Sequence, residues 1–114
     1  MQRHVAIPHC SKYPNPISFR IGAVVTLGAT DDEDPGWIRA RLADGNEGWA
    51  PEAILERRTG ASGLATATAD YDAHELETVV GESLEVLREL NGWFWARNAR
   101  GEEGWVPWKT TLEA

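Results

Sequence analysis

His9 and Cys10 are neighbouring residues whose side chains could in principle do nucleophilic chemistry together. A catalytic thiol needs a positioned base and a third group that orients the base. Neighbouring residues of an extended chain point to opposite faces, so His9 is poorly placed to activate Cys10. The chain contains no G-x-S-x-G elbow, no P-loop and no G-x-G-x-x-G sequence. The sequence therefore predicts a protein that is not an enzyme and needs no cofactor.

Two groups of residues resemble metal ligands but lack the spacing that metal sites require. His4, His9 and Cys10 are not accompanied by a second cysteine pair or by an H-x-x-x-H sequence. The acidic run 31–34 lacks the alternating ligands and the final glutamate of a calcium loop. We expect residues 31–34 to form a solvated loop and the protein to bind no metal.

Charge, cysteine content and hydropathy limit the classes of partner. The net charge is −7, which disfavours nucleic-acid binding because phosphate contacts need a basic surface. No apolar run is long enough to span a membrane, and the N-terminus lacks the apolar core of a secretory signal. The single cysteine cannot form an intramolecular disulfide. These features predict a cytoplasmic protein that binds neither nucleic acid nor membrane.

A stretch of sixteen residues occurs twice. Residues 36–51 read GWIRARLADGNEGWAP and residues 92–107 read GWFWARNARGEEGWVP, with ten identical positions at an offset of 56. Such a repeat indicates a tandem of two similar units. We expect the first domain to span residues 1–58 and the second to span residues 63–114, joined by a short tether at residues 57–63. Units of this size bury a small core, so we expect the two to pack against each other.

The local pattern in each repeat is that of short β-strands. Residues 24–27, 37–41, 84–87 and 93–97 are strand-like, and Gly45 and Gly101 mark tight turns between strands. Residues 51–55 are compatible with one 3₁₀ turn. We also expect Gly48 and Gly104 to have a positive φ, because each begins a return strand. The sequence predicts an all-β protein made of two five-stranded barrels.

The second repeat resembles an SH3 domain along its length. Four segments match the family in order and spacing. They are the opening ATADY (67–71), the end of the RT loop with the strand after it, ELETVVGE (75–82), the strand GWFWAR (92–97), and the Gly-aromatic-aliphatic-Pro motif GWVP (104–107). The first repeat resembles the family from Pro16 to Ile54. Pro8 and Cys10 fall at the positions of its two opening tyrosines. The chain as a whole is most similar to tandem variant SH3-like proteins of bacteria.

The resemblance implies an aromatic groove that holds an extended, proline-rich or basic segment of another protein. The family's ligand-facing positions correspond in the second domain to Tyr71, Glu75, Trp93, Trp105 and Pro107. In the first domain they correspond to Trp37 and Pro51. Most of the groove residues lie in the second domain, so we expect binding mainly there.

Alternation along the strands makes a separate prediction for the tryptophans. Ala40 and Ala96 are expected in the core, with Trp37 and Trp93 on the opposite, outward face. Trp49 and Trp105 are expected to serve packing at least as much as binding. Trp95 and Trp108 are candidates for an interface between the domains.

Two alternatives to peptide binding remain open. The aromatic surfaces could be buried in interfaces of a structural or accessory subunit. Cell-wall binding is the other, and the absence of a signal sequence disfavours it. We expect a monomer or a weak homodimer.

Overall fold

The protein is built from β-strands and two short 3₁₀ turns. The computed structural model describes residues 1–60 and 62–113. Within this part of the chain there are twelve strands, and the 3₁₀ turns η1 (Glu52–Ile54) and η2 (Trp108–Thr110) have three residues each. None of the helices in the described ranges has the length and hydrophobicity needed to cross a membrane. The all-β class predicted from the sequence is confirmed.

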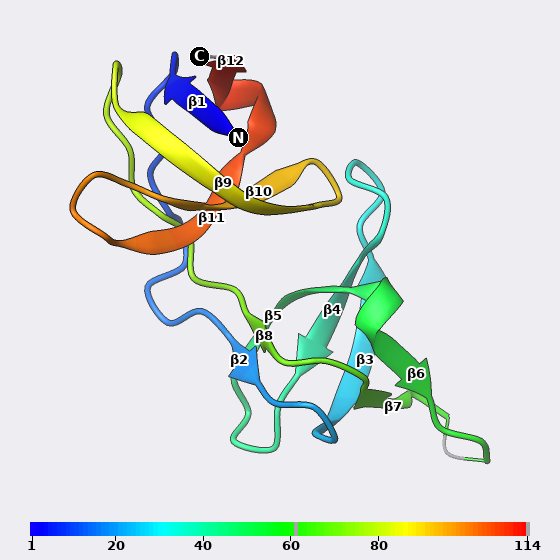
Figure 1. The fold of residues 1–114 in the computed structure, drawn as a ribbon. Helices are drawn as coiled ribbons and strands as arrows, with labels where there is room; N and C mark the ends of the chain where they lie inside the picture. Colours follow the sequence, from blue (N-terminus) through cyan, green and yellow to red (C-terminus); the bar gives the residue numbers. More distant parts are fainter. Residues whose placement is uncertain (61, 114) are drawn as a thin grey trace. The chain divides into compact units, whose positions relative to one another are not determined.

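The chain divides into two compact units that do not coincide with the two sequence repeats. Unit 1 consists of Met1–Pro14 together with His74–Ala114, and unit 2 consists of Asn15–Ala73. The chain therefore begins in unit 1, passes through unit 2 and returns to unit 1 (Figure 1). These units differ from the contiguous domains 1–58 and 63–114 expected from the repeat.

Unit 1 contains a five-stranded antiparallel sheet in the order β11-β10-β9-β1-β12. Its elements are β1 (Gln2–Val5), β9 (Ser83–Leu90), β10 (Trp93–Arg97), β11 (Glu103–Pro107), η2 and β12 (Thr111–Glu113). One cluster of buried side chains forms its core: Val5, Leu76, Leu84, Ala96 and Val106. The core combines a residue from the start of the chain with residues from its second half.

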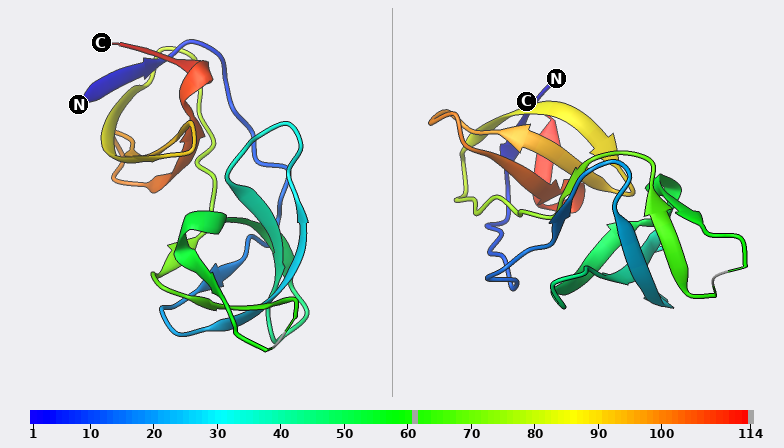
Figure 2. Two further views of the ribbon diagram at one scale, coloured as in Figure 1. Left: turned by 90° about the vertical axis from the view of Figure 1, so that its right-hand side faces the viewer. Right: turned by 90° about the horizontal axis from the view of Figure 1, so that it is seen from below.

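Unit 2 has the same plan, with the order β5-β4-β3-β7-β6. Its elements are β2 (Ser18–Phe19), β3 (Val24–Thr30), β4 (Trp37–Arg41), β5 (Glu47–Pro51), η1, β6 (Leu55–Arg57), β7 (Leu64–Ala67) and β8 (Tyr71–Asp72). Strands β2 and β8 form a separate two-stranded ladder. Figure 2 shows from two further sides that the strands of both sheets are strongly curved.

Neither five-stranded sheet closes into the barrel that we expected. In unit 1 the edge strands are β11 and β12, and in unit 2 they are β5 and β6. Pro107 and Pro51 end β11 and β5, and a proline offers no N–H to extend a ladder. The following 3₁₀ turn leads the chain to the opposite edge, where β12 pairs with β1 and β6 pairs with β7. The prediction of five strands is right and the prediction of closure is wrong.

We call β1 and β7 the first strands, because each lies at the start of a sequence repeat. Each of them pairs with strands of the other repeat. Strand β1 pairs with β9 and β12, which belong to the second repeat. Strand β7, from the start of the second repeat, pairs with β3 and β6 of the first. Residues 57–63 are therefore the connection of the β6–β7 hairpin within unit 2, and the prediction of a tether between domains is wrong; residue 61 of that segment lies outside the described residues. Figure 1 shows β1, in blue, beside β9 and β12.

This exchange of first strands leads to a direct test of the unit boundaries. Val5 is 1% exposed and belongs to the core of unit 1, so Val5→Ala should destabilise that unit by about 2 kcal/mol. Hydrogen exchange measured by mass spectrometry should then show faster exchange in residues 83–107 and not in residues 24–51.

The matched control is Val25→Ala, because Val25 is equally buried but lies in β3 of unit 2. It should produce the opposite pattern. Faster exchange in residues 24–51 of the Val5→Ala variant would mean that β1 pairs within its own repeat.

Candidate binding site

The hydrogen bonds of the two first strands show which of their residues are equivalent. The Gly81 N–H donates to the Val5 carbonyl at 2.8 Å, and the Gly22 N–H donates to the Ala67 carbonyl at the same distance. Val5 in unit 1 therefore occupies the position that Ala67 occupies in unit 2.

Counting four residues onward from these positions pairs His9 with Tyr71. The sequence comparison had placed Cys10 at the position of the second opening tyrosine, and this assignment is wrong by one residue. The reason is the register between β1 and β12. Val5 pairs with Thr111 in unit 1, just as Ala67 pairs with Leu55 in unit 2. His9 was not among the predicted site residues, because its neighbours in space belong to the other repeat.

His9 lies at the centre of a cluster in unit 1, here called the His9 cluster, with Glu75, Trp93 and Pro107. Its Nε2 is 2.7 Å from Glu75 Oε1, within hydrogen-bonding distance. Its ring meets Trp93 edge-on, with centroids 5.6 Å apart. Pro107 is the register partner of Trp93 on the neighbouring strand β11. The cluster thus joins an acidic group to a half-buried indole and a proline.

The backbone on both sides of the cluster holds its polar members in place. The His9 N–H donates to Thr78 Oγ1 at 2.9 Å, and the Thr78 N–H donates to the His9 carbonyl at 3.0 Å. Next to Glu75, the Leu76 N–H donates to the Trp105 carbonyl at 3.0 Å. These bonds fix both ends of the contact between imidazole and carboxylate.

At Gly104, β11 closely approaches the segment that carries Glu75. An added Cβ at Gly104 would lie 2.8 Å from the Leu76 nitrogen and 3.1 Å from its Cβ. In unit 2, a Cβ at Gly48 would lie 3.1 Å from side-chain atoms of Ile17. Neither glycine has a positive φ, so our prediction on that ground was wrong. Gly45 and Gly101, at the hairpin turns, do have a positive φ of 90° and 83°.

The equivalent residues in unit 2 are packed more tightly. Trp37 is only 7% exposed, which contradicts the outward position that alternation predicted. Its ring packs on Tyr71 at a centroid distance of 6.4 Å, and Tyr71 in turn contacts Phe19 at 5.6 Å. The difference is confined to the tryptophans, because Pro51, the register partner of Trp37, and its counterpart Pro107 are both buried. The larger phenol ring covers the indole, whereas His9 leaves Trp93 half-exposed.

The groove predicted from the sequence is consequently divided between the two units. Glu75, Trp93, Trp105 and Pro107 lie in unit 1, but Tyr71 lies in unit 2 with Trp37 and Pro51. The exchange of first strands causes this division, because Tyr71 follows β7 and Glu75 comes after the chain has returned to unit 1.

Trp105 and Trp95 pack against each other on unit 1. Their rings meet edge-on at 5.3 Å, and the Arg88 guanidinium lies 5.2 Å above the Trp105 ring. Trp95 Nε1 donates to Glu103 Oε1 at 2.8 Å. Trp105 is thereby left 2% exposed, as expected of a packing residue. Ala96, on the same sheet, is fully buried as predicted.

Trp108 is the most exposed of the tryptophans, at 52%. Its backbone N–H donates to the Gly92 carbonyl at 3.0 Å. Its ring would lie 3.3 Å from a Cβ placed on Gly92. Gly92 and Pro107 are the chain neighbours of Trp93 and Trp108 respectively. Trp108 therefore adds apolar surface next to the His9 cluster.

Cys10 has an environment that disfavours the thiolate form. Its Sγ donates to Glu77 Oε1 at 3.5 Å, and this hydrogen bond, with the negative charge of Glu77, raises the pKa of the thiol. Nucleophilic chemistry and metal binding both need the thiolate. Among the described residues, no three His, Cys, Asp or Glu side chains gather in a way that could hold a metal ion.

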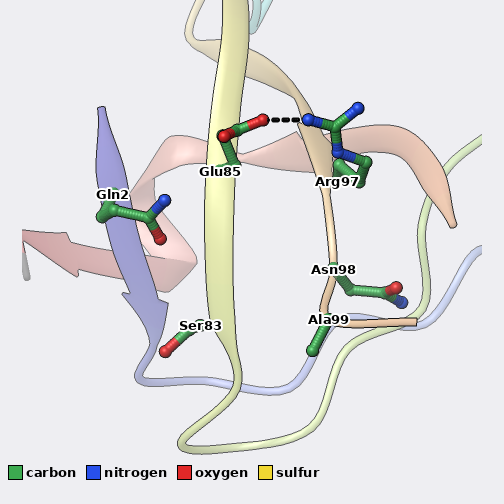
Figure 3. Close-up of a pocket in the computed structure, with 6 residues that line it drawn as sticks. All are labelled: Gln2, Ser83, Glu85, Arg97, Asn98 and Ala99. Carbon is green, nitrogen blue, oxygen red and sulfur yellow. Dashed lines mark hydrogen bonds and ion pairs between the residues drawn. The ribbon is translucent and has the colours of Figure 1, made fainter. Parts of the chain in front are cut away.

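Unit 1 has an open hollow of about 270 Å³. Figure 3 shows the residues that line it, which are Gln2, Ser83, Glu85, Arg97, Asn98 and Ala99. Its charged side chains pair with each other, since Arg97 forms a salt bridge with Glu85. Asn98 Nδ2 donates to Glu102 Oε1 at 2.9 Å. The hollow therefore offers a ligand few unengaged polar groups, and the His9 cluster is the stronger candidate site.

Comparison with known families identifies one matching stretch of the chain. Residues 3–58 match the family model of the variant SH3 domain. This match supports an SH3-like domain protein. The matched stretch runs from β1 to β6, so in this SH3-like protein it includes a first strand that pairs in unit 1. No curated protein and no solved structure matches the chain.

The close approach at Gly104 predicts a stability difference between the two repeats. Gly104→Ala should destabilise the protein by about 3 kcal/mol, because the new methyl group meets backbone that cannot rotate away. Gly48→Ala should have an effect of about 1 kcal/mol, because Ile17 can adjust its side chain. Urea denaturation of both variants measures the difference. Equal losses would show that the segment bearing Glu75 does not cross β11 this closely.

Proposed function

We propose that this SH3-like protein is a non-enzymatic binding module that holds an extended, proline-rich or basic segment of another protein on the His9 cluster. SH3-like domains as a class suggest a binding role. The observation that supports this particular site is that Trp93, beside the Glu75 carboxylate, is only half-buried. Its counterpart in unit 2, Trp37, is buried.

The apolar part of the cluster suits a polyproline II segment. Such a segment is already extended in solution, so it loses little conformational entropy when it binds. Trp93 is half-buried and lies opposite the buried Pro107 on β11, and the exposed Trp108 follows Pro107 in the chain. Flat rings of this kind pack well against prolines.

The charge of the cluster favours a basic residue in the ligand. Glu75 is the carboxylate of the cluster, and its side chain is 14% exposed. His9 contacts the same carboxylate, so a ligand lysine or arginine would compete with or displace the imidazole. The net charge of −7 would also speed the approach of a basic segment.

A structural role is the second candidate, and it applies mainly to unit 2. Trp37, Tyr71 and Pro51 are buried there, as residues of a core would be. Trp37 Nε1 is nevertheless a buried donor without an acceptor among the described residues. A buried unpaired donor is destabilising, so Trp37 Nε1 lowers the stability of unit 2.

Substitution of the two equivalent tryptophans separates these roles. Trp93→Ala should weaken peptide binding at least tenfold and lower stability by about 2 kcal/mol, less than for a fully buried tryptophan because the ring is half-buried. Trp37→Phe should leave affinity unchanged, since it keeps the aromatic packing and removes the unpaired donor. Peptides chosen from an array of proline-rich and basic sequences are titrated by calorimetry, with thermal melts to confirm folding.

Two outcomes would contradict the proposal. One is the absence of any peptide that binds at millimolar concentration. The other is an equal loss of affinity in the Trp37→Phe variant, which would move the site to unit 2.

The charge preference gives an independent prediction. Glu75→Lys should weaken binding of basic peptides about tenfold, and Glu75→Gln should weaken it less, because the amide keeps a hydrogen-bonding oxygen. Added salt should weaken wild-type binding and have little effect on the Glu75→Gln variant. Glu89→Lys is the matched control, because Glu89 is an exposed acid on β9 of the same unit. If Glu89→Lys weakens binding as much, net charge and not the cluster sets the preference.

A further inference from the structure

The pairing of β1 and β7 with strands of the other repeat does not depend on what the His9 cluster binds. Strand β1 completes the sheet of unit 1 and β7 completes the sheet of unit 2, although each comes from the other sequence repeat. Both units therefore depend on a strand that reaches them from elsewhere in the chain.

The positions of the two strands are equivalent and are defined mainly by backbone groups. In unit 1 the Ala6 N–H donates to the Thr110 carbonyl at 2.9 Å. In unit 2 the Thr68 N–H donates to the Ile54 carbonyl at 2.8 Å. Because every residue except proline carries both an N–H and a C=O group, such a position can accept a strand of the right length from another copy of the chain.

Side-chain packing restricts which segment can occupy the β1 position in the sheet of unit 1. Val5 is 1% exposed in the core of unit 1, and its counterpart Ala67 is 2% exposed in unit 2. Arg3 is buried as well, with Nε donating to Thr111 Oγ1 at 2.6 Å and Nη2 donating to the Thr111 carbonyl at 3.0 Å. The best-fitting occupant of the unit 1 position is therefore the segment Gln2–Val5 itself.

The chain leaves unit 1 through a short segment that contains two prolines. The boundary between unit 1 and unit 2 lies between Pro14 and Asn15, and the next residue is Pro16. Proline fixes its own φ and restricts the residue before it, and the chain bends at Pro14 and Asn15 as it leaves unit 1. Short hinges with a restricted backbone invite exchange of a terminal element between molecules.

We propose that two copies of this protein exchange residues 1–14 reciprocally, so that β1 of each copy completes the unit 1 sheet of the other. The contacts formed are the same as within one chain, so the balance depends on protein concentration. Exchange competes with an effective concentration of about millimolar for a short intramolecular connection. Dimers should therefore form near that concentration, or when concentrated chains refold together.

Two single-cysteine variants test this arrangement. His4 on β1 is the register partner of Leu112 on β12, and both side chains are at least partly exposed. His4→Cys and Leu112→Cys are each made in a Cys10→Ser background, mixed in equal amounts, refolded together and oxidised. A disulfide between the two variants can form at this position only when β1 of one copy lies on β12 of the other.

The expected result is a covalent heterodimer of twice 12.6 kDa whose yield rises at least tenfold between micromolar and millimolar refolding. The control mixes Leu112→Cys with Asp44→Cys, because Asp44 lies in an exposed turn of unit 2. In parallel, light scattering follows the mass of the unmodified protein, which does not depend on the variants folding.

The outcomes are distinct. A heterodimer in the first mixture and little in the control supports reciprocal exchange. An unmodified protein that remains monomeric after refolding at millimolar concentration overturns it. Dimers without the bond between positions 4 and 112, or equal yields in both mixtures, show association by another surface and also overturn it.

Discussion

The ladder that places β1 between β9 and β12 is the interaction on which unit 1 depends. It brings Val5 into the core and connects the two halves of the sheet. A unit of this size has little other buried surface, so the loss of one strand would expose both apolar side chains and unpaired backbone groups. Strand β7 has the same role in unit 2, between β3 and β6.

This pairing also decides the composition of the candidate site. The residue four positions after the end of the pairing is His9 in unit 1 and Tyr71 in unit 2. His9 contacts a carboxylate and leaves Trp93 half-exposed, whereas Tyr71 packs over Trp37 and buries it. Two units that share a sixteen-residue repeat therefore present different surfaces to a ligand.

Features that depend on local spacing could be predicted from the sequence. The strands at 37–41 and 93–97, the buried alanines Ala40 and Ala96, and the turn glycine Gly101 are where the pattern placed them. Alternation failed at Trp37, because a residue from another strand covers its outward face. Gly104 was recognised as constrained for the wrong reason, since the constraint comes from Leu76 on a distant segment and not from φ.

The sequence by itself determined the all-β class, the number of units and most of the strands, because side-chain alternation and turn chemistry act over a few residues. Only the tertiary structure decided which first strand completes which sheet, and hence that His9 and not Tyr71 lies beside Trp93. The physical reason is that strands pair through backbone N–H and C=O groups that every residue except proline carries. Such groups leave no mark in the sequence that distinguishes one partner strand from another.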